Sequence, residues 1–257
     1  MAWDAKQYLT FSDHRLQPAI DLLARVQGLK GFVPNTIYDL GCGPGNITAH
    51  MKTLWPHANI TGIDSSPEML TRAKGDFPNM QWQQCDVDAW HPECQPDLIF
   101  SNAALHWLGT HEDLFPKLLD HLPSNGALAV QMPNNFTRPT HSLVVDAAER
   151  SGCYEVLTPL FKPAPTQSPA FYYQHLSPHC QHLDIWECDY LQTLSGDNPV
   201  VGWTKGTWLR PFLEALHGDM KEEFERCYRD LIKKAYPALA DGKTLVPFKR
   251  LFILAVK

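Results

Sequence analysis

A glycine-rich turn, Asp39-Leu40-Gly41-Cys42-Gly43-Pro44-Gly45, constrains this chain more than any other feature of its sequence. It ends a predicted buried strand at 36–40 and precedes a predicted helix at 46–54, with Asn46 as the expected N-cap. Glycines at such a point let the backbone bend tightly and approach a ligand without a Cβ in the way. In open parallel sheets, ligands bind beyond the carboxyl ends of the strands. We therefore expect a ligand site at this turn.

The segments around the turn alternate between strand-like and helix-like patterns. Further strands are expected at 60–64, 80–85, 97–101 and 126–132, and later ones at 183–194 and 250–256. Helices are expected after Ser66, an N-cap followed by Pro67 at the first helical position, and at 112–122. This alternation predicts an α/β fold, a doubly wound, mostly parallel seven-stranded sheet of the Rossmann-like kind covered on both faces.

The pattern changes after the fifth predicted strand, where prolines become dense. We expect a single domain over residues 1–257, with a helical lid at 1–30 and a helical or irregular cap inserted at 133–182. Within and after the cap, helices are expected at 141–149, 198–217 and 221–234.

Composition narrows the classes of partner. The formal net charge of −6 argues against a nucleic-acid partner, which would need a concentrated basic surface. The seven cysteines form no regular framework, which favours reduced thiols. No secretory signal and no apolar run of bilayer length is visible, so we expect a cytoplasmic protein without membrane association. The clustered His and Cys residues at 175–188 lack the paired spacing of zinc sites, and no metal is expected.

The spacing of the glycines distinguishes two cofactor classes. Dinucleotide sites favour G-x-G-x-x-G, and here Asn46 stands where the third glycine would be. Pro44 also removes an N–H donor from a loop that would otherwise hold a pyrophosphate. S-adenosyl-L-methionine has no phosphate and tolerates that loss, so the sequence favours it over a dinucleotide.

An acidic residue stands at the carboxyl end of each of the first three predicted strands. Asp39 suits the ammonium group of such a cofactor, and Asp64 is placed to accept hydrogen bonds from ribose hydroxyls. Asp86, with the Val87 N–H beside it, is expected near the adenine amino group. Asp64 alone would serve NAD equally well, but the three positions together indicate a cofactor site.

The motifs Asp-x-Gly-Cys-Gly-x-Gly, Gly-Ile-Asp-Ser-Ser at 62–66 and Cys-Asp-Val at 85–87 resemble those of the class I methyltransferases that use S-adenosylmethionine. Across nearly the whole chain, the sequence resembles the trans-aconitate 2-methyltransferase family more closely. That likeness rests on Trp3, Tyr8, Phe11, Arg15 and Pro18-Ala19, and on the segments 39–66, 97–103, 106–108, 129–133, 172–173, 209–211 and 250–253. The resemblance implies that Tyr8, Arg15, Ser65 and Asn102 also belong to the cofactor site.

The resemblance further implies methyl transfer to a carboxylate of a small polycarboxylic acid. Such an acceptor is already ionised at pH 7, so no general base is expected. Arg210 is the candidate carboxylate clamp, and Tyr172 and Tyr173 are candidate hydroxyl donors from the cap. Trp107 is expected to wall the acceptor pocket, with His106 as the candidate for a catalytic contact.

Two alternatives stay open at this point. The first is a methyltransferase with another small acceptor, such as the carboxylate of a malonyl thioester on a carrier protein. The second is a methyltransferase-fold protein without catalytic activity that binds a ligand. The intact acidic residues disfavour the second, and the scarcity of basic residues in the cap disfavours the first.

Overall fold

The computed structural model describes residues 12–206 and 208–257, with side chains from residue 16 onward. Contacts between residues divide the described chain into two compact units. The helical unit consists of Asn134–Ala164 and Asp189–Lys249. The sheet unit consists of the described residues up to Pro133, together with Pro165–Cys188 and Arg250–Lys257.

Seven strands form one sheet, as the sequence predicted, in the order β3-β2-β1-β4-β5-β7-β6. Their bounds are β1 (Thr36–Leu40), β2 (Asn59–Asp64), β3 (Gln81–Gln84), β4 (Leu98–Asn102), β5 (Ala127–Pro133), β6 (His182–Ser195) and β7 (Lys243–Val256). Strands β1 to β5 pair in parallel, and β7 pairs with β5 in the antiparallel direction. The strand order reverses between β1 and β4, which is where a doubly wound sheet binds its ligands.

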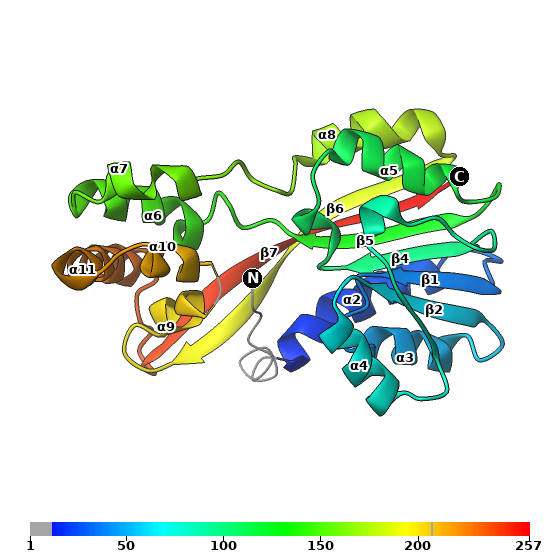
Figure 1. Cartoon of the computed structure of the whole chain (residues 1–257), viewed down its shortest axis with the longest axis horizontal. Helices are drawn as coiled ribbons and strands as arrows, with labels where there is room; N and C mark the ends of the chain where they lie inside the picture. Colours follow the sequence, from blue (N-terminus) through cyan, green and yellow to red (C-terminus); the bar gives the residue numbers. More distant parts are fainter. Residues whose placement is uncertain (1–11, 207) are drawn as a thin grey trace. The chain divides into compact units, whose positions relative to one another are not determined.

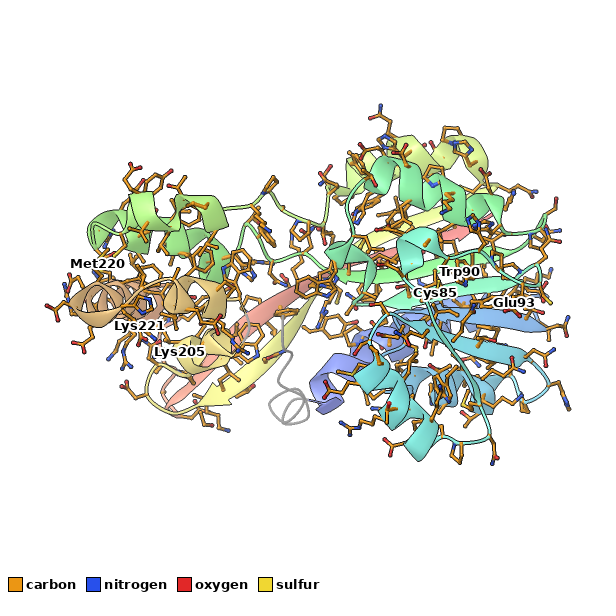
Figure 2. The ribbon with its side chains drawn as sticks, viewed as in Figure 1. Cys85, Trp90, Glu93, Lys205, Met220 and Lys221 are labelled. Carbon is orange, nitrogen blue, oxygen red and sulfur yellow. The ribbon has the colours of Figure 1, made fainter. Side chains whose placement is uncertain are left out.

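Helices cover both faces of the sheet within the sheet unit (Figure 1). On one face lie α2 (Ser12–Gln27), α3 (Asn46–Leu54) and α4 (Pro67–Asp76), and on the other lie α5 (His111–Asp120) and α8 (Pro169–Leu176). The core under α5 and α8 is apolar and includes Tyr38, Trp90, Phe115 and Leu128. Trp90, marked in Figure 2, is fully buried there. Burial of such large side chains is the main source of stability for this unit.

The helical unit has a core of its own. It contains α6 (Pro139–Arg150), α7 (Tyr154–Leu157), α9 (Pro199–Lys205), α10 (Arg210–Glu214) and α11 (Gly218–Ala235). Helix α11 packs along α6, and the Tyr228 hydroxyl donates to the Thr140 carbonyl at 2.9 Å. Lys205 of α9, labelled in Figure 2, pairs with Glu225 of α11. The chain also has short 3₁₀ turns at Thr158–Leu160 and Ser177–His179.

The helix boundaries predicted from local sequence signals were confirmed in one case and wrong in others. Ser66 caps α4 by accepting from the Met69 N–H, and Pro67 is its first residue, so this prediction is confirmed. The prediction for Asn46 is wrong, because Gly45 is the N-cap of α3, with φ of 85°, and Asn46 is already helical. The helix expected at 198–217 is divided into α9 and α10, with Gly206 ending the first. Pro211, which has no N–H to donate, stands at the start of the second.

The division into units does not follow the boundaries expected for the cap. Residues 134–164 group with 189–249, whereas 165–182 belong to the sheet unit. Of the lid expected at 1–30, the described part forms α2, which packs against β5 and α3. Among the described residues, no helix has the length and apolar character required to span a bilayer.

Candidate cofactor and acceptor site

The glycine turn stands at the carboxyl end of β1, at the point where the strand order reverses. The N–H groups of Gly41 and Cys42 donate to the Ile63 carbonyl of the neighbouring strand, at 2.8 and 2.9 Å. Gly41, Gly43 and Gly45 have φ values of 74°, 55° and 85°. This left-handed backbone is costly for residues with a Cβ, so the turn requires glycine at all three positions.

The space around the three glycines shows which of them are needed for packing and which leaves room for a ligand. A Cβ on Gly41 would lie 2.1 Å from the Cβ of Ala104, and one on Gly45 would lie 2.3 Å from the Trp82 ring. These two glycines therefore let neighbouring chain segments pack against the turn. Around Gly43, apart from this residue and its two neighbours in the chain, no atom of the described residues lies within 4 Å of such a Cβ. Gly43 is thus the position at which a ligand can approach the backbone closely, which fits a cofactor site.

Asp39 is buried at the end of β1, on the side of the sheet that α3 covers. The hydroxyl of Thr48, from α3, donates to its Oδ2 at 2.6 Å. Burial raises the pKa of the Asp39 carboxyl from 3.8 to about 7; the Thr48 hydrogen bond opposes the rise and the Asp64 carboxylate adds to it. A carboxyl so close to half ionisation at neutral pH is stabilised as the anion by any cation placed beside it.

Asp64 connects the glycine turn to the start of α4. Its Oδ2 accepts from the Gly43 N–H and its Oδ1 from the Ser66 N–H, both at 2.8 Å, while Ser65 is exposed. Each oxygen of an ionised carboxylate has a second lone pair, so Asp64 can also accept from a ligand hydroxyl. Asp64 therefore holds the glycine turn in place, a structural role that the sequence did not indicate.

Asp86 follows β3 and is exposed. Its Oδ1 accepts from the Asp88 N–H and so caps the 3₁₀ turn Val87–Ala89, in which Val87 is buried. The free thiol of Cys42 lies within the glycine turn. Burial raises its pKa, and the nearby Asp39 and Asp64 carboxylates add to this, so the thiol is protonated and unreactive near neutral pH.

Asn102 ends β4 and begins a second group of polar side chains. Its Oδ1 is buried and has no hydrogen-bond partner among the described residues. The next residue, Ala103, has φ of 55°, a strained conformation for alanine that is found most often at functional sites. His106 follows in the 3₁₀ turn Leu105–Trp107 and is 8% exposed. Burial, then Arg250 and His111, lower the pKa of His106 to about 3, so its imidazole is neutral.

Two further polar residues of the sheet unit were missed as site candidates. Gln131, near the end of β5, and Arg250, at the sheet-unit end of β7, are both buried. Gln131 is the polar residue within the otherwise apolar buried run 127–132 of β5, and Arg250 begins the otherwise apolar buried run 250–255 of β7. That contrast is visible in the sequence and was the available signal.

The structure places the residues expected to bind substrate in different environments. Trp107 is 68% exposed, and its ring centroid lies 4.7 Å from that of His106. Tyr173 is also exposed. Arg210 lies in the helical unit, where its Nε donates to Glu214 Oε1 at 2.7 Å. The expected positions of Tyr8 and of the Arg15 side chain fall outside the described residues.

Tyr172 is fully buried in the core, and its hydroxyl is already engaged. His111 Nε2 lies 2.9 Å from the Leu105 carbonyl, which can only accept, so Nε2 carries the proton of this histidine. Burial lowers the pKa of His111, and its neutral Nδ1 then accepts from the Tyr172 hydroxyl at 2.8 Å. The Gln167 N–H donates to the same hydroxyl at 3.1 Å. Because its one proton is used by His111, Tyr172 is a packing residue rather than a hydroxyl donor.

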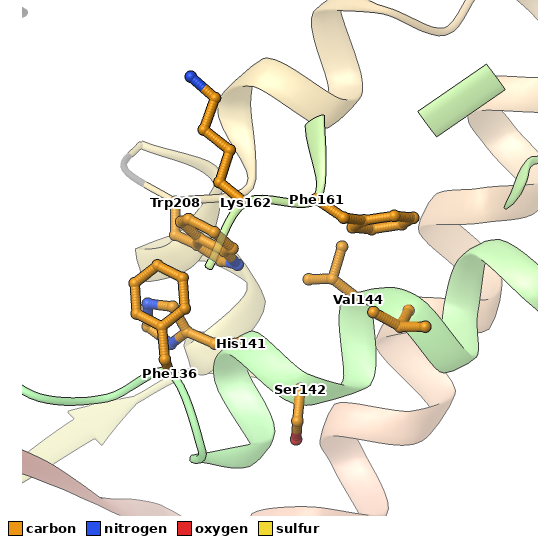
Figure 3. A pocket seen from close by; sticks show the side chains of 8 residues that line it. Phe136, His141, Ser142, Val144, Phe161, Lys162 and Trp208 are labelled. Atoms are coloured by element: carbon orange, nitrogen blue, oxygen red, sulfur yellow. The ribbon is translucent and has the colours of Figure 1, made fainter. Parts of the chain in front are cut away.

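The helical unit contains a small hollow of about 140 Å³, shown in Figure 3. Its walls are mainly apolar and aromatic: Phe136, His141, Val144, Val145, Phe161 and Trp208, with Ser142 and Lys162. His141 stands 4.7 Å from Trp208 between ring centroids, and burial lowers its pKa to about 4. No group of three or more potential metal ligands occurs among the described side chains.

Comparison with known proteins agrees with this geometry. Residues 37–126 match the family model described as "Methyltransferase domain". The YcgJ protein of Bacillus subtilis has a similar structure, with a TM-score of 0.58 at 15% identity over 93% of this chain and 98% of that one. A plantazolicin methyltransferase solved with S-adenosylhomocysteine (SAH) has a TM-score of 0.57 at 16% identity, over 98% and 88% of the two chains. The strand order and these two structural likenesses define the fold, a Rossmann-like seven-stranded sheet flanked by helices.

Full-length relatives specify the family within this class. The trans-aconitate 2-methyltransferase of Azoarcus sp. is 43% identical over 99% of both chains. Those of Sinorhizobium fredii and Streptomyces coelicolor are 39% and 40% identical, over 100% and 99% of this chain and 99% and 86% of the relatives. The chain belongs to the trans-aconitate 2-methyltransferase family.

Proposed function

We propose that this protein transfers a methyl group from S-adenosylmethionine to a carboxylate oxygen of trans-aconitate, forming a monomethyl ester. The observation that carries the proposal is the open approach to Gly43 between Asp39 and Asp64, in a chain about 40% identical over its full length to trans-aconitate 2-methyltransferases. A dinucleotide would need further N–H donors for its pyrophosphate, and Pro44 supplies none.

The strand-end residues suit the parts of this cofactor. The ionised form of Asp39 would hold the ammonium group, and the free lone pairs of Asp64 would accept from the ribose hydroxyls. Asp86 and the Val87 N–H would recognise the adenine. Ser65, next to Asp64, and Asn102, at the end of β4, would complete the cofactor site. Tyr8 and Arg15, on the expected N-terminal lid, would cover the bound cofactor.

The reaction does not require a general base from the protein. When bound, S-adenosylmethionine supplies an electrophilic methyl group. Transfer of that methyl group to a carboxylate oxygen would break the carbon–sulfur bond and leave the sulfur as a neutral thioether, so the protein would need only to hold the acceptor oxygen toward the methyl group. The acceptor has no proton to lose, and the neutral His106 is suited to hydrogen bonding rather than to taking up a proton. Positioning oxygen, carbon and sulfur in line can supply roughly 7–11 kcal/mol of the acceleration.

The test is methyl transfer from methyl-labelled S-adenosylmethionine to a panel of small acids. The panel contains trans-aconitate, cis-aconitate, citrate, tricarballylate and malonyl-pantetheine. We expect base-labile label in an ester of trans-aconitate, with kcat/KM for the other acids lower by tenfold or more. Preferred transfer to malonyl-pantetheine would show that the acceptor is a malonyl thioester and not trans-aconitate. Cofactor binding without transfer to any acid would overturn the proposed activity.

A further inference from the structure

Gln131 is the most unusual buried residue of the sheet unit. It is 0% exposed, and neither its Oε1 nor its Nε2 has a hydrogen-bond partner among the described residues. The preceding residues of β5, Ala127 to Val130, are all buried and apolar. An unpaired amide in such a place costs free energy, so it is rarely kept without a role.

Strand register places Gln131 in a row with other polar side chains. Asn102 of β4 pairs with Gln131, and Gln131 pairs with Phe252 of β7, so these side chains share one face of the sheet. Arg250 lies two residues before Phe252 and therefore points to the same face. Asp39 shares that face too, because it pairs with Phe100 of β4, two residues before Asn102.

This row extends from the cofactor residues across the adjacent strands. In the sheet order β1-β4-β5-β7, it holds Asp39, Asn102, Gln131 and Arg250, one per strand. Neighbouring strands are about 4.8 Å apart, so Gln131 lies roughly 10 Å from Asp39 across the sheet. That spacing leaves room for the amino-acid end of the cofactor over β1 and for an acceptor over β5 and β7.

The chemistry of the far end of the row suits an anion. Arg250 is 6% exposed and supplies a buried positive charge, which acts on His106. His106 Nδ1 is buried and has no partner among the described residues. Gln131 Nε2 can donate to an anion while Oε1 accepts from a water molecule. Hydrogen bonds from a guanidinium to a carboxylate are among the strongest in proteins, and the two neutral side chains can add further hydrogen bonds.

We propose that Gln131, Arg250 and His106 form the acceptor subsite and bind a carboxylate of the substrate beside the reacting oxygen. The choice of trans-aconitate as the ligand rests on the proposed function, whereas the carboxylate subsite rests on the geometry of the row.

The experiment is calorimetric titration of tricarballylate, a saturated tricarboxylate, and of trans-aconitate into protein saturated with SAH, which has no methyl group to transfer. Gln131→Met keeps the side-chain volume and removes both polar atoms. Gln131→Asn keeps an amide and withdraws it by one methylene, and Arg250→Gln removes the charge. Gln83→Met, on β3 and separated from β5 by three strands, is the matched control. Circular dichroism identifies the folded variants, and SAH affinity is measured in each of them.

We expect Gln131→Met and Arg250→Gln to weaken tricarboxylate binding by roughly tenfold or more, with SAH affinity within about twofold of the wild type. Gln131→Asn should lose less, and Gln83→Met should bind both ligands as the wild type does. Unchanged tricarboxylate binding in any folded Gln131 variant would overturn the subsite. So would an equal loss of SAH and tricarboxylate affinity, which would place Gln131 with the cofactor or in the fold.

The same titrations keep this inference apart from the proposed function. If the wild type binds tricarboxylates through Gln131 but methylates none of them, the proposed reaction fails and the subsite stands. If it methylates trans-aconitate and the variants bind equally well, the reaction stands and the subsite fails. If the wild type binds no tricarboxylate, both fail.

Discussion

Asp39 offers the sharpest test of the reasoning, because its burial opposes folding and serves ligand binding at once. The carboxyl pKa is about 7 in the folded protein and 3.8 without the fold. Because the folded-state value is the higher one, the unfolded chain gives up the proton first as pH rises. The free energy of unfolding therefore falls between about pH 4 and pH 7, by roughly 4 kcal/mol in total at 1.36 kcal/mol per pKa unit.

The substitution Asp39→Asn removes this titration and keeps an oxygen that can accept from Thr48. Relative to the wild type, we expect the variant to gain roughly 1.5 kcal/mol at pH 5 and roughly 4 kcal/mol at pH 8. Urea denaturation of both proteins at the two pH values measures the difference, and titrations common to both proteins cancel in the comparison. An equal stability change at pH 5 and pH 8 would show that Asp39 does not ionise in this range and would refute the argument.

Cofactor binding should move in the opposite direction. A ligand with an ammonium group binds the ionised form of Asp39, so wild-type affinity for SAH should fall by up to about tenfold per pH unit below pH 7. Asp39→Asn should bind SAH more weakly at pH 8 and lose most of this pH dependence. Calorimetry from pH 6 to pH 8 checks both statements, and a wild-type affinity that is flat over this range would separate Asp39 from the ammonium group.

Three further substitutions test the site. Gly43→Ala should fold, with about 1 kcal/mol of backbone strain, and lose SAH affinity, whereas Gly41→Ala should chiefly lower the melting temperature because its Cβ meets a neighbour at 2.1 Å. A Gly43→Ala variant with wild-type SAH affinity would argue against close ligand approach there. Tyr172→Phe should cost about 1–2 kcal/mol of stability by removing the partner of His111, with the acceptor KM unchanged, and a large rise in that KM would restore its role as a donor. Arg210→Ala should raise the acceptor KM and leave SAH affinity intact. Because its exposed ion pair contributes under about 1 kcal/mol of stability, the variant should fold, and an unchanged KM would exclude Arg210 as the carboxylate clamp.

Local features were predictable where the chemistry of a few consecutive residues decides the structure. Ser66-Pro67 is such a case, since an N-cap hydroxyl and a proline without an N–H suit only the start of a helix. The predictions failed where two local signals competed. At the start of α3, Asn46 is a good cap by residue type, but Gly45 already has the left-handed conformation that ends the turn. The helix expected at 198–217 fails for a related reason, because Gly206 and Pro211 interrupt an otherwise suitable pattern.

The sequence by itself determined the sheet, the glycine turn and the acidic residues at the carboxyl ends of β1, β2 and β3. These depend on periodicity and on backbone conformations that only glycine adopts cheaply, and both are local properties of the chain. The tertiary structure decided what each polar residue can do. The Tyr172 hydroxyl donates a hydrogen bond to His111, which is 61 positions away in the chain. Gln131 and Arg250 came onto one face through strand register. Burial, charge and hydrogen-bond partners arise only when distant segments pack together, so no stretch of the sequence could have specified them.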